Sequence, residues 1–257
     1  MNKIVLTAFV ACVVFMAGSG TAVAQDDGMK VIPVELIACT YNDRKGPADL
    51  DRWVDKWTAW ADRNDIDYYA AWTLTPFYYG PGQNSGFDFV WMGAAKNAVV
   101  LGEGNAAYIA TNDGLQDELG EIATCGSRAN FASINFKAPP ADNPPDGAVL
   151  TMSDCSFESG ATFAALGTAM EEWSQYMSSA GSDAGYFHWY PQYGGGGETF
   201  DFKWMTAHAS LADLGADYEV IGNGRGFETR GRLLNHLVDC DSARAYLAEN
   251  RRFTQLR

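Results

Sequence analysis

The sequence predicts an α+β fold in which two copies of one βαββαβ unit follow each other along the chain. The first observation is an internal repeat, because the hexapeptide at Phe87–Met92 (FDFVWM) recurs at Phe200–Met205 (FDFKWM), 113 residues later. The second is that both copies show the period-two alternation of strands and the longer period of helices in the same order. The third is that each copy carries one pair of cysteines at corresponding places.

The repeat extends well beyond the shared hexapeptide. Further matches keep the same order in both copies, with offsets between 113 and 116 residues. Many ordered matches at nearly constant spacing are typical of a duplicated structural unit. The matched pairs include Cys39 with Cys155, Pro76 with Pro191, Leu101 with Leu214, and Cys125 with Cys240.

Residues 1–24 have the three parts of a secretion signal. Lys3 supplies the positive start, the apolar run Ile4–Ala17 follows, and Ala22–Ala24 has the small-x-small pattern that signal peptidase cleaves. A membrane anchor is the alternative, but the run is too short to cross about 30 Å of hydrocarbon. We therefore expect cleavage after Ala24 and an exported mature protein, either periplasmic or secreted. No later apolar stretch reaches spanning length, so membrane insertion of the mature chain is not expected.

The first copy is expected to occupy residues 25–137. Its first helix is the clearest element, because Trp53, Trp57 and Trp60 recur at helical spacing and form one apolar face. A loop rich in glycine, at residues 80–86, separates two aromatic-rich strands and predicts a hairpin. The predicted elements are a strand at Val34–Tyr41, a helix at Asp49–Asn64, strands at Tyr68–Tyr78 and Phe87–Ala94, a helical region ending before Cys125, and a strand at Asn130–Lys137.

A proline-rich connector is predicted at residues 138–147, because proline removes backbone donors and favours extended chain. The second copy is then expected to occupy residues 148–257 and to repeat the order of the first. Its predicted elements are a strand at Val149–Phe157, a helix at Phe163–Ser179, strands at Gly185–Tyr193 and Phe200–His208, a helical region within Leu211–Leu237, and a strand at Ala243–Arg252.

The formal net charge of −14 is spread along the chain rather than gathered in a tail. A surface this acidic repels phosphates and anionic lipid headgroups, so nucleic acids and anionic membranes are not expected partners. Aromatic residues make up 13% of the chain, which excludes disorder for most of its length.

The βαββαβ order is that of the ferredoxin-like unit, an antiparallel sheet with two helices on one face. With this order duplicated in one chain, the protein resembles the dimeric α+β barrel superfamily, which includes monooxygenase-like, EthD-like and NIPSNAP-like proteins. Within it the chain is most similar to exported members with a Cys-Ser-like pair before the last strand. The resemblance implies two ferredoxin-like sheets that cover each other in a pseudo-symmetric α+β barrel, a monomer with an internal pseudo-dimer. It assigns no catalytic residue.

Cys12 leaves with the predicted signal, so four cysteines remain. An even number in an exported protein favours disulfides. In a ferredoxin-like sheet the first and last strands are neighbours, which favours Cys39–Cys125 and Cys155–Cys240 among the three connectivities. Each bridge would contribute roughly 4 kcal/mol of stability by closing a long loop. A metal site is disfavoured, because no zinc-like spacing is present.

The candidates for acid–base catalysis are His188, Asp201 and Asp88. The two aspartates hold equivalent positions at the start of the third strand in each copy. If they face a barrel interior, they are placed for proton transfer; alternatively, they accept hydrogen bonds from hairpin amides. His188 lies on the second strand of the second copy, and histidine titrates near neutrality; alternatively, it is packed in the core. His208 ends the following strand, but the spacing of these groups does not support a metal site.

The aromatic residues of the strands are candidates for ligand binding. Aromatic walls suit a flat or apolar ligand, because they offer a large contact area. The alternative is that these side chains only fill the core. The candidates are Trp72, Tyr78, Trp91, Trp189, Tyr193 and Trp204.

These observations favour an exported protein that binds a small apolar or aromatic molecule in, or beside, the barrel, without a cofactor or metal. The alternative is an enzyme in the same cavity, cofactor-independent or haem-assisted and of a monooxygenase-like or isomerase-like kind. A structural or protein-interaction module is the third possibility.

Overall fold

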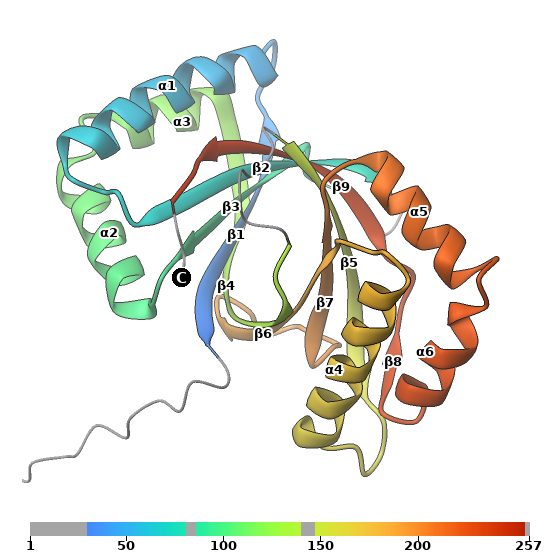
Figure 1. The fold of residues 1–257 in the computed structure, drawn as a ribbon. Helices are drawn as coiled ribbons and strands as arrows, with labels where there is room; N and C mark the ends of the chain where they lie inside the picture. Colours follow the sequence, from blue (N-terminus) through green and yellow to red (C-terminus); the bar gives the residue numbers. More distant parts are fainter. Residues whose placement is uncertain (1–29, 81–85, 140–146, 255–257) are drawn as a thin grey trace, which may run out of the picture.

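In the computed structural model, which describes residues 30–80, 86–139 and 147–254, a central barrel of antiparallel strands is flanked by two groups of helices (Figure 1). The helices within residues 47–122 cover one side of the barrel, and those within residues 163–234 cover the other. The predicted secretion signal and most of the connector at residues 138–147 lie outside the described residues.

The first copy forms a ferredoxin-like unit with sheet order β4-β1-β3-β2. We call it unit one. Its elements are β1 (Val31–Tyr41), α1 (Pro47–Arg63), β2 (Tyr69–Tyr78), β3 (Phe89–Ala95), α2 (Ala98–Thr111), α3 (Leu115–Ile122) and β4 (Ala123–Lys137).

The second copy, unit two, repeats this arrangement. Strand β5 pairs with β7 on one side and with both β8 and β9 on the other, and β7 also pairs with β6. The predicted fold class, two tandem ferredoxin-like units in one α+β barrel, is therefore confirmed. The elements are β5 (Gly147–Phe157), α4 (Phe163–Ser179), β6 (Gly185–Tyr193), β7 (Phe202–His208), α5 (Leu211–Ile221), α6 (Gly226–Leu234), β8 (Val238–Cys240) and β9 (Arg244–Arg252).

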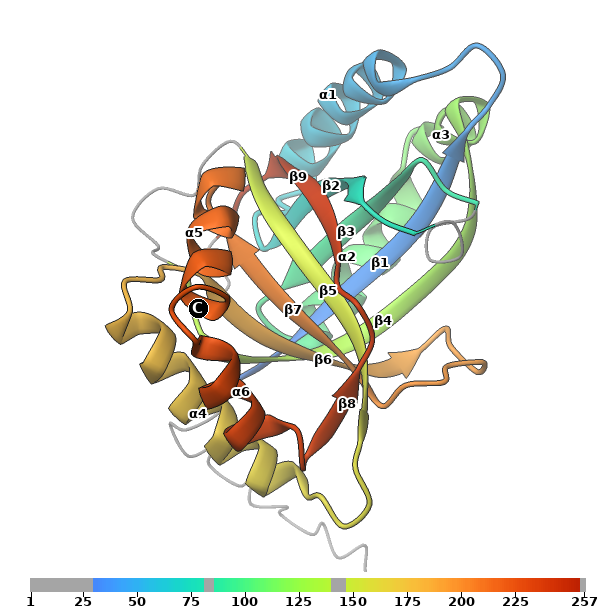
Figure 2. The same cartoon turned by 90° about the vertical axis from the view of Figure 1, so that its right-hand side faces the viewer.

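The barrel closes because each unit pairs its outer strand with the last strand of the other. Strand β4 pairs with β6, and β9 pairs with β2, both antiparallel. Figure 2 shows these strands crossing between the two helical layers. Each unit thus supplies hydrogen-bond partners to the sheet edge that the other would leave open.

Several predicted elements differ from the observed ones. Strand β4 begins at Ala123, well before the predicted Asn130, because its polar first part is held in extended form by pairing with β1. The helical region of unit one is two helices, since Asp113 and Gly114 between them adopt left-handed backbone conformations that end α2. The helical region of unit two is likewise two helices, α5 and α6. Its predicted last strand corresponds to β9 and is preceded by an additional short strand, β8.

Helix α1 shows how local sequence and packing agree. Pro47 opens the helix, and the Asp49 carboxylate accepts a hydrogen bond from the Gly46 amide at 3.1 Å, which caps its start. The predicted apolar face is buried: Trp53 and Trp57 pack edge-on against Trp91 of β3, with ring centroids 5.7 and 5.0 Å apart.

The core has three layers, because the barrel strands are buried on both faces. One layer lies between α1, α2, α3 and the barrel, a second between α4, α5, α6 and the barrel, and the third fills the barrel interior. In β3 every residue is buried, with Trp91 in the outer layer and Val90 in the interior. Successive residues of one strand therefore belong to different layers.

The structure contains both predicted disulfides. Cys39–Cys125 joins β1 to β4, and Cys155–Cys240 joins β5 to β8. In unit one the bridge links the first strand to the last, and in unit two it links the first strand to β8, which precedes the last strand. Two disulfides are compatible with an exported protein.

Candidate functional site

A cavity of about 450 Å³ opens in the barrel interior. This volume lies within the range typical of small-molecule sites, roughly 300–1,000 Å³. Its wall comes from both units and carries apolar, aromatic and charged side chains. The lining residues are Leu36, Ala38, Leu74, Phe87, Val90, Ser127, Ala129, Phe131, Met152, Asp154, Lys203, Asp241, Arg244 and Tyr246.

The two units line this cavity differently. The strand registers make Ala38 of unit one equivalent to Asp154 of unit two, because Ala38 pairs with Val90 and Asp154 pairs with Lys203. Val90 and Lys203 are accordingly equivalent to each other. At these two positions the cavity wall is therefore apolar in unit one and charged in unit two.

A third equivalent pair completes the contrast. Ala129 pairs with Leu36 in unit one, and Arg244 pairs with Met152 in unit two. The charged side of the cavity thus carries a guanidinium where the apolar side carries only a methyl group.

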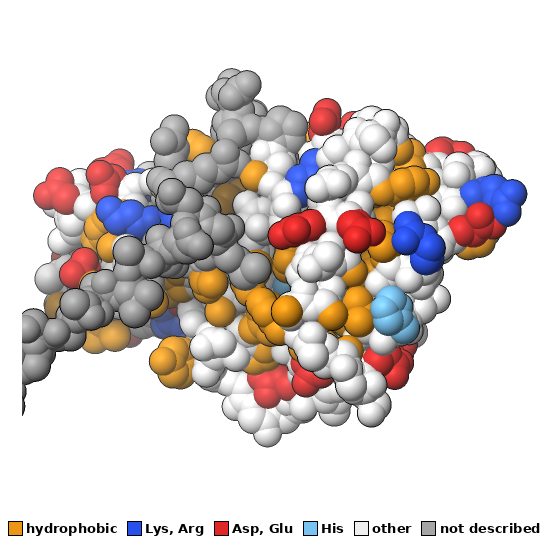
Figure 3. Space-filling view, turned by 60° about the horizontal axis from the view of Figure 1, so that its bottom comes forward, with side chains coloured by type: hydrophobic (Ala, Val, Ile, Leu, Met, Phe, Trp, Pro, Cys, Tyr) orange, Lys and Arg blue, Asp and Glu red, His pale blue; other side chains and the backbone are white. Residues whose placement is uncertain are grey.

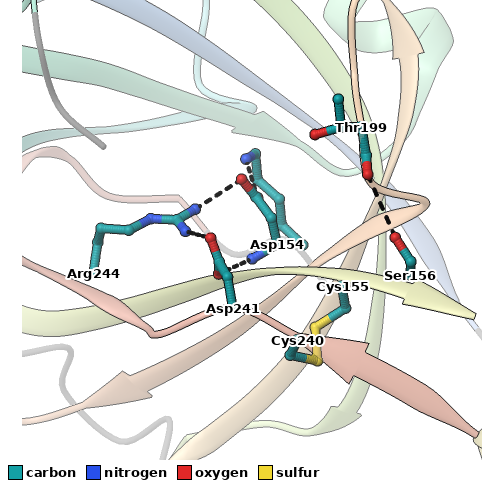
Figure 4. A network of polar contacts seen from close by, with 8 residues as sticks. Asp154, Cys155, Ser156, Thr199, Cys240, Asp241 and Arg244 are labelled. Atoms are coloured by element: carbon teal, nitrogen blue, oxygen red, sulfur yellow. Dashed lines mark hydrogen bonds and ion pairs between the residues drawn. A yellow bond between two sulfur atoms is a disulfide. The ribbon is translucent and has the colours of Figure 1, made fainter. Parts of the chain in front are cut away.

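The charged side chains form one connected cluster, which we call the Asp154 network: Lys203, Asp154, Arg244 and Asp241. Lys203 Nζ donates to Asp154 Oδ1 at 2.5 Å, and Arg244 Nη2 lies 3.0 Å from Asp154 Oδ2. Arg244 Nη1 donates to Asp241 Oδ2 at 2.5 Å. Figure 4 shows Asp154, Arg244 and Asp241 converging in this way. Asp154 therefore bridges the two cations.

The cations of the network are more deeply buried than its anions. The side chains of Arg244 and Lys203 are 6% and 17% exposed, whereas those of Asp154 and Asp241 are 29% and 42% exposed. Burial lowers the pKa of Arg244, but the carboxylates of Asp154 and Asp241 outweigh burial and hold its pKa above the usual value. The guanidinium is therefore a permanent charge, and solvent reaches the network from its carboxylate side.

The Cys155–Cys240 disulfide joins β5 to β8 beside the two aspartates of the network. Asp154 directly precedes Cys155, and Asp241 directly follows Cys240 (Figure 4). Next to the bridge, the Asp154 amide donates to Asp241 Oδ1 at 2.8 Å, and the Asp241 amide donates to the Asp154 carbonyl at 3.0 Å. The bridge and these bonds fix the separation of the two carboxylates.

The predicted acids Asp88 and Asp201 lie outside the cavity wall. Both are exposed, and they occupy equivalent places: Asp88 Oδ2 accepts from the Tyr41 amide at 2.7 Å, and Asp201 Oδ2 accepts from the Phe157 amide at 2.8 Å. Each carboxylate thus accepts the hydrogen bond of a backbone N–H at the end of the first strand of its unit. The alternative considered from the sequence had them accept hydrogen bonds from hairpin amides; here the donors are instead the amides at the ends of β1 and β5.

His188 is fully buried, but it faces the outer layer of unit two and not the barrel cavity. Its ring packs against Phe136 and Phe202, with centroids 4.6 and 4.4 Å away, and its Nε2 has no hydrogen-bond partner among the described residues. Burial lowers its pKa from 6.5 to about 3, so the imidazole is neutral.

The histidines and Asp201 do not form a joint site. His208 lies 3.6 Å from the buried Asp217, and burial lowers the pKa of His208. Within the described ranges, no group of three or more His, Cys, Asp or Glu side chains is placed to hold a metal.

The predicted aromatic ligand-binding residues have three different locations. Trp91 and Trp204 lie in the outer layers, against the helices. Trp72 and Trp189 lie in the interior layer, but outside the cavity wall. Tyr78 and Tyr193 are exposed near hairpin ends; they are placed in no core layer. The aromatic part of the wall consists instead of Phe87, Phe131 and Tyr246.

Sequence reasoning missed the Asp154 network, although a signal for it was present. The duplicated hexapeptide differs at one position, where FDFVWM has Val90 and FDFKWM has Lys203. The hexapeptide is otherwise identical in the two copies, so a lysine in place of valine indicates a specific role for that lysine. The same comparison at Ala38 and Asp154 would have extended the signal.

The outer surface offers no comparable feature on the face seen in Figure 3. There, acidic and basic side chains are interspersed, with apolar side chains between them. In the part of the chain that the structure describes, no helix has the length and apolar character needed to cross a bilayer.

No protein-family model matches the sequence, and neither does any curated protein. Solved structures do match the fold. A protein provisionally named a chlorite dismutase has a TM-score of 0.50 and 12% identity, over 86% of this chain and 94% of its own. Two variants of chlorite dismutase from Candidatus Nitrospira defluvii have TM-scores of 0.50 at 11% and 10% identity, over 86% of this chain and 92% of theirs. At such low identity the likeness shows a shared fold: this chain has the duplicated ferredoxin-like α+β barrel of chlorite dismutase-like structures.

Proposed function

We propose that this protein binds a small amphipathic molecule inside the barrel. The observation that carries the proposal is a contrast at three equivalent positions of one cavity, which are apolar in unit one and charged in unit two. The apolar part of the ligand lies against Leu36, Val90 and Phe131, and its polar end meets the Asp154 network.

Each wall has a distinct energetic role. Apolar contact contributes about 25 cal/mol for each Å² of surface removed from water, but it is not directional. The N–H groups of Lys203 and Arg244 are directional, and a few such groups in a mainly apolar pocket set the orientation of a ligand. The two walls together therefore select an amphipathic molecule and orient it.

Binding is tested with N-phenyl-1-naphthylamine, an uncharged apolar fluorophore that brightens in an apolar site. We expect saturable fluorescence with the full protein. We also expect Ala129→Trp to abolish it, because Ala129 lines the cavity and an indole there fills the space. Ala106→Trp, on an exposed position of α2, is the control and should bind the probe as the parent protein does.

Circular dichroism should show that both tryptophan variants remain folded. Absence of saturable fluorescence in the parent protein would refute the proposal. Equal binding by Ala129→Trp and the parent would refute the location of the site.

A haem-assisted enzyme is the second candidate function. Two observations favour it: the structural neighbours are named for an enzymatic activity, and the neutral His188 has a buried Nε2 without a partner among the described residues. The neighbours' names support this alternative more than they support simple binding. An unpaired imidazole nitrogen is a common metal ligand.

The surroundings of His188 do not fit a haem. Its ring is enclosed by Phe136, Tyr190, Phe202 and Trp204, with centroid distances between 4.4 and 6.3 Å. These side chains occupy the space that a porphyrin beside Nε2 would need. We therefore assign no catalytic step to such a group.

Titration of the protein with haemin distinguishes the two candidates. We expect no saturable change in the Soret band, because His188 is enclosed by aromatic rings. A stoichiometric Soret shift that His188→Phe abolishes, and that the exposed-site variant His236→Gln retains, would replace the first candidate with the second.

A further inference from the structure

We propose that the molecule bound in the barrel is uncharged and presents a hydrogen-bond acceptor, such as an amide or ketone carbonyl, to Lys203 and Arg244. This inference rests on the proposed function and names the chemical class of its ligand. It follows from the charges, the hydrogen bonds and the shape of the charged side of the cavity.

The charge of the network is already balanced. Lys203 and Arg244 supply two positive charges, Asp154 and Asp241 supply two negative charges, and all four line the cavity. A charged ligand would leave one charge in the barrel without a counterion. An unpaired charge away from water is costly, whereas a neutral ligand leaves the balance unchanged.

The hydrogen bonds indicate which polar group a ligand needs. Both oxygens of Asp154 are engaged, one by each cation, and both oxygens of Asp241 are engaged, by Arg244 and by the Asp154 amide. An ammonium has three N–H donors and a guanidinium has five. Lys203 uses one of them on Asp154, and Arg244 contacts Asp154, Asp241 and Tyr246. The network therefore has N–H donors left for a ligand acceptor.

The opposite wall determines the remainder of the ligand. At the positions equivalent to Asp154, Lys203 and Arg244, unit one carries Ala38, Val90 and Ala129. Among the lining residues, unit one contributes one polar side chain, Ser127, and no charged one. A molecule with one carbonyl end and an apolar body matches both walls.

The test is displacement of N-phenyl-1-naphthylamine by three probes with the same alkyl chain: octanamide, octanoate and octylammonium. We expect octanamide to displace the dye at concentrations about tenfold lower than either ion, the difference that 1.4 kcal/mol produces. If the dye does not bind, the proposed function itself fails. If the dye binds and an ion displaces it best, only the inference on ligand charge is overturned.

Two single substitutions change the charge of the network in opposite directions. Asp154→Asn leaves it with an excess positive charge, so octanoate should become the strongest competitor. Lys203→Met leaves an excess negative charge, so octylammonium should become the strongest. Either variant suffices if the other does not fold. An unchanged order of competitors in a folded variant would overturn the inference.

Discussion

Acidification is expected to destabilise the folded protein by about 1.4 kcal/mol per pH unit through His188 alone, from pH 6.5 down to about pH 3. Burial lowers the pKa of His188 to about 3 in the folded protein, against 6.5 for an unperturbed histidine. Between these values the unfolded chain binds a proton that the folded chain does not. The free energy of unfolding therefore rises with pH across this window, and above pH 6.5 the full contribution of His188 to it is present.

The contribution of His188 is isolated by comparison with His188→Phe. Phenylalanine retains an aromatic ring among Phe136, Phe202 and Trp204, and it does not titrate. Urea denaturation at several pH values should give a smaller loss of stability on acidification for this variant than for the parent. Carboxylates titrate in both proteins, so the difference between the two slopes reports His188.

The exposed His236 provides the control for this experiment. His236→Gln should retain the slope of the parent protein. If the parent and His188→Phe lose stability equally on acidification, then His188 is not held neutral by burial, and its assignment to the packed outer layer is wrong.

The second large effect is expected from removing the Cys155–Cys240 bridge. The double variant Cys155→Ala, Cys240→Ala should lower the free energy of unfolding by about 4 kcal/mol, measured by urea denaturation. The bridge spans 85 residues of sequence, and closing a loop of this length restricts the unfolded chain. The same variant should also weaken binding of N-phenyl-1-naphthylamine, because the bridge joins β5 to β8 beside Asp154 and Asp241.

The Cys39–Cys125 bridge is a matched control, since it spans 86 residues and links the equivalent strands of unit one. Its double alanine variant should lose a similar amount of stability. It should affect dye binding less, because the neighbouring cavity residues Ala38 and Ser127 belong to no charged network. Equal loss of binding in both variants would show that the bridges act on the barrel as a whole.

The sequence predicted the architecture well because a duplication restricts the possible folds. An ordered repeat with alternating and helical periods indicates two like units. The position of each cysteine on, or just before, a first or last strand indicates its partner. The tryptophan face of α1 was likewise readable, since Trp53, Trp57 and Trp60 lie on consecutive turns. These features depend on spacing along the chain.

The binding wall was not predicted, because the strands are buried on both faces. Alternation showed that Trp91 and Val90 point to opposite sides of one strand, but it did not show which side is the cavity. The large aromatic residues Trp91 and Trp204 were natural candidates for a ligand site, yet they pack against helices. The residues that precede them in the strands, Val90 and Lys203, line the cavity instead.

By itself, the sequence determined that this chain contains two ferredoxin-like units, each with its own disulfide, since periodicity and repetition are properties of the linear chain. Only the tertiary structure decided which strand faces enclose space and that Asp154, Lys203, Asp241 and Arg244 meet there. The physical reason is that these residues lie on β5, β7, the turn after β8, and β9. Their proximity arises from barrel closure, which brings together segments far apart in the sequence.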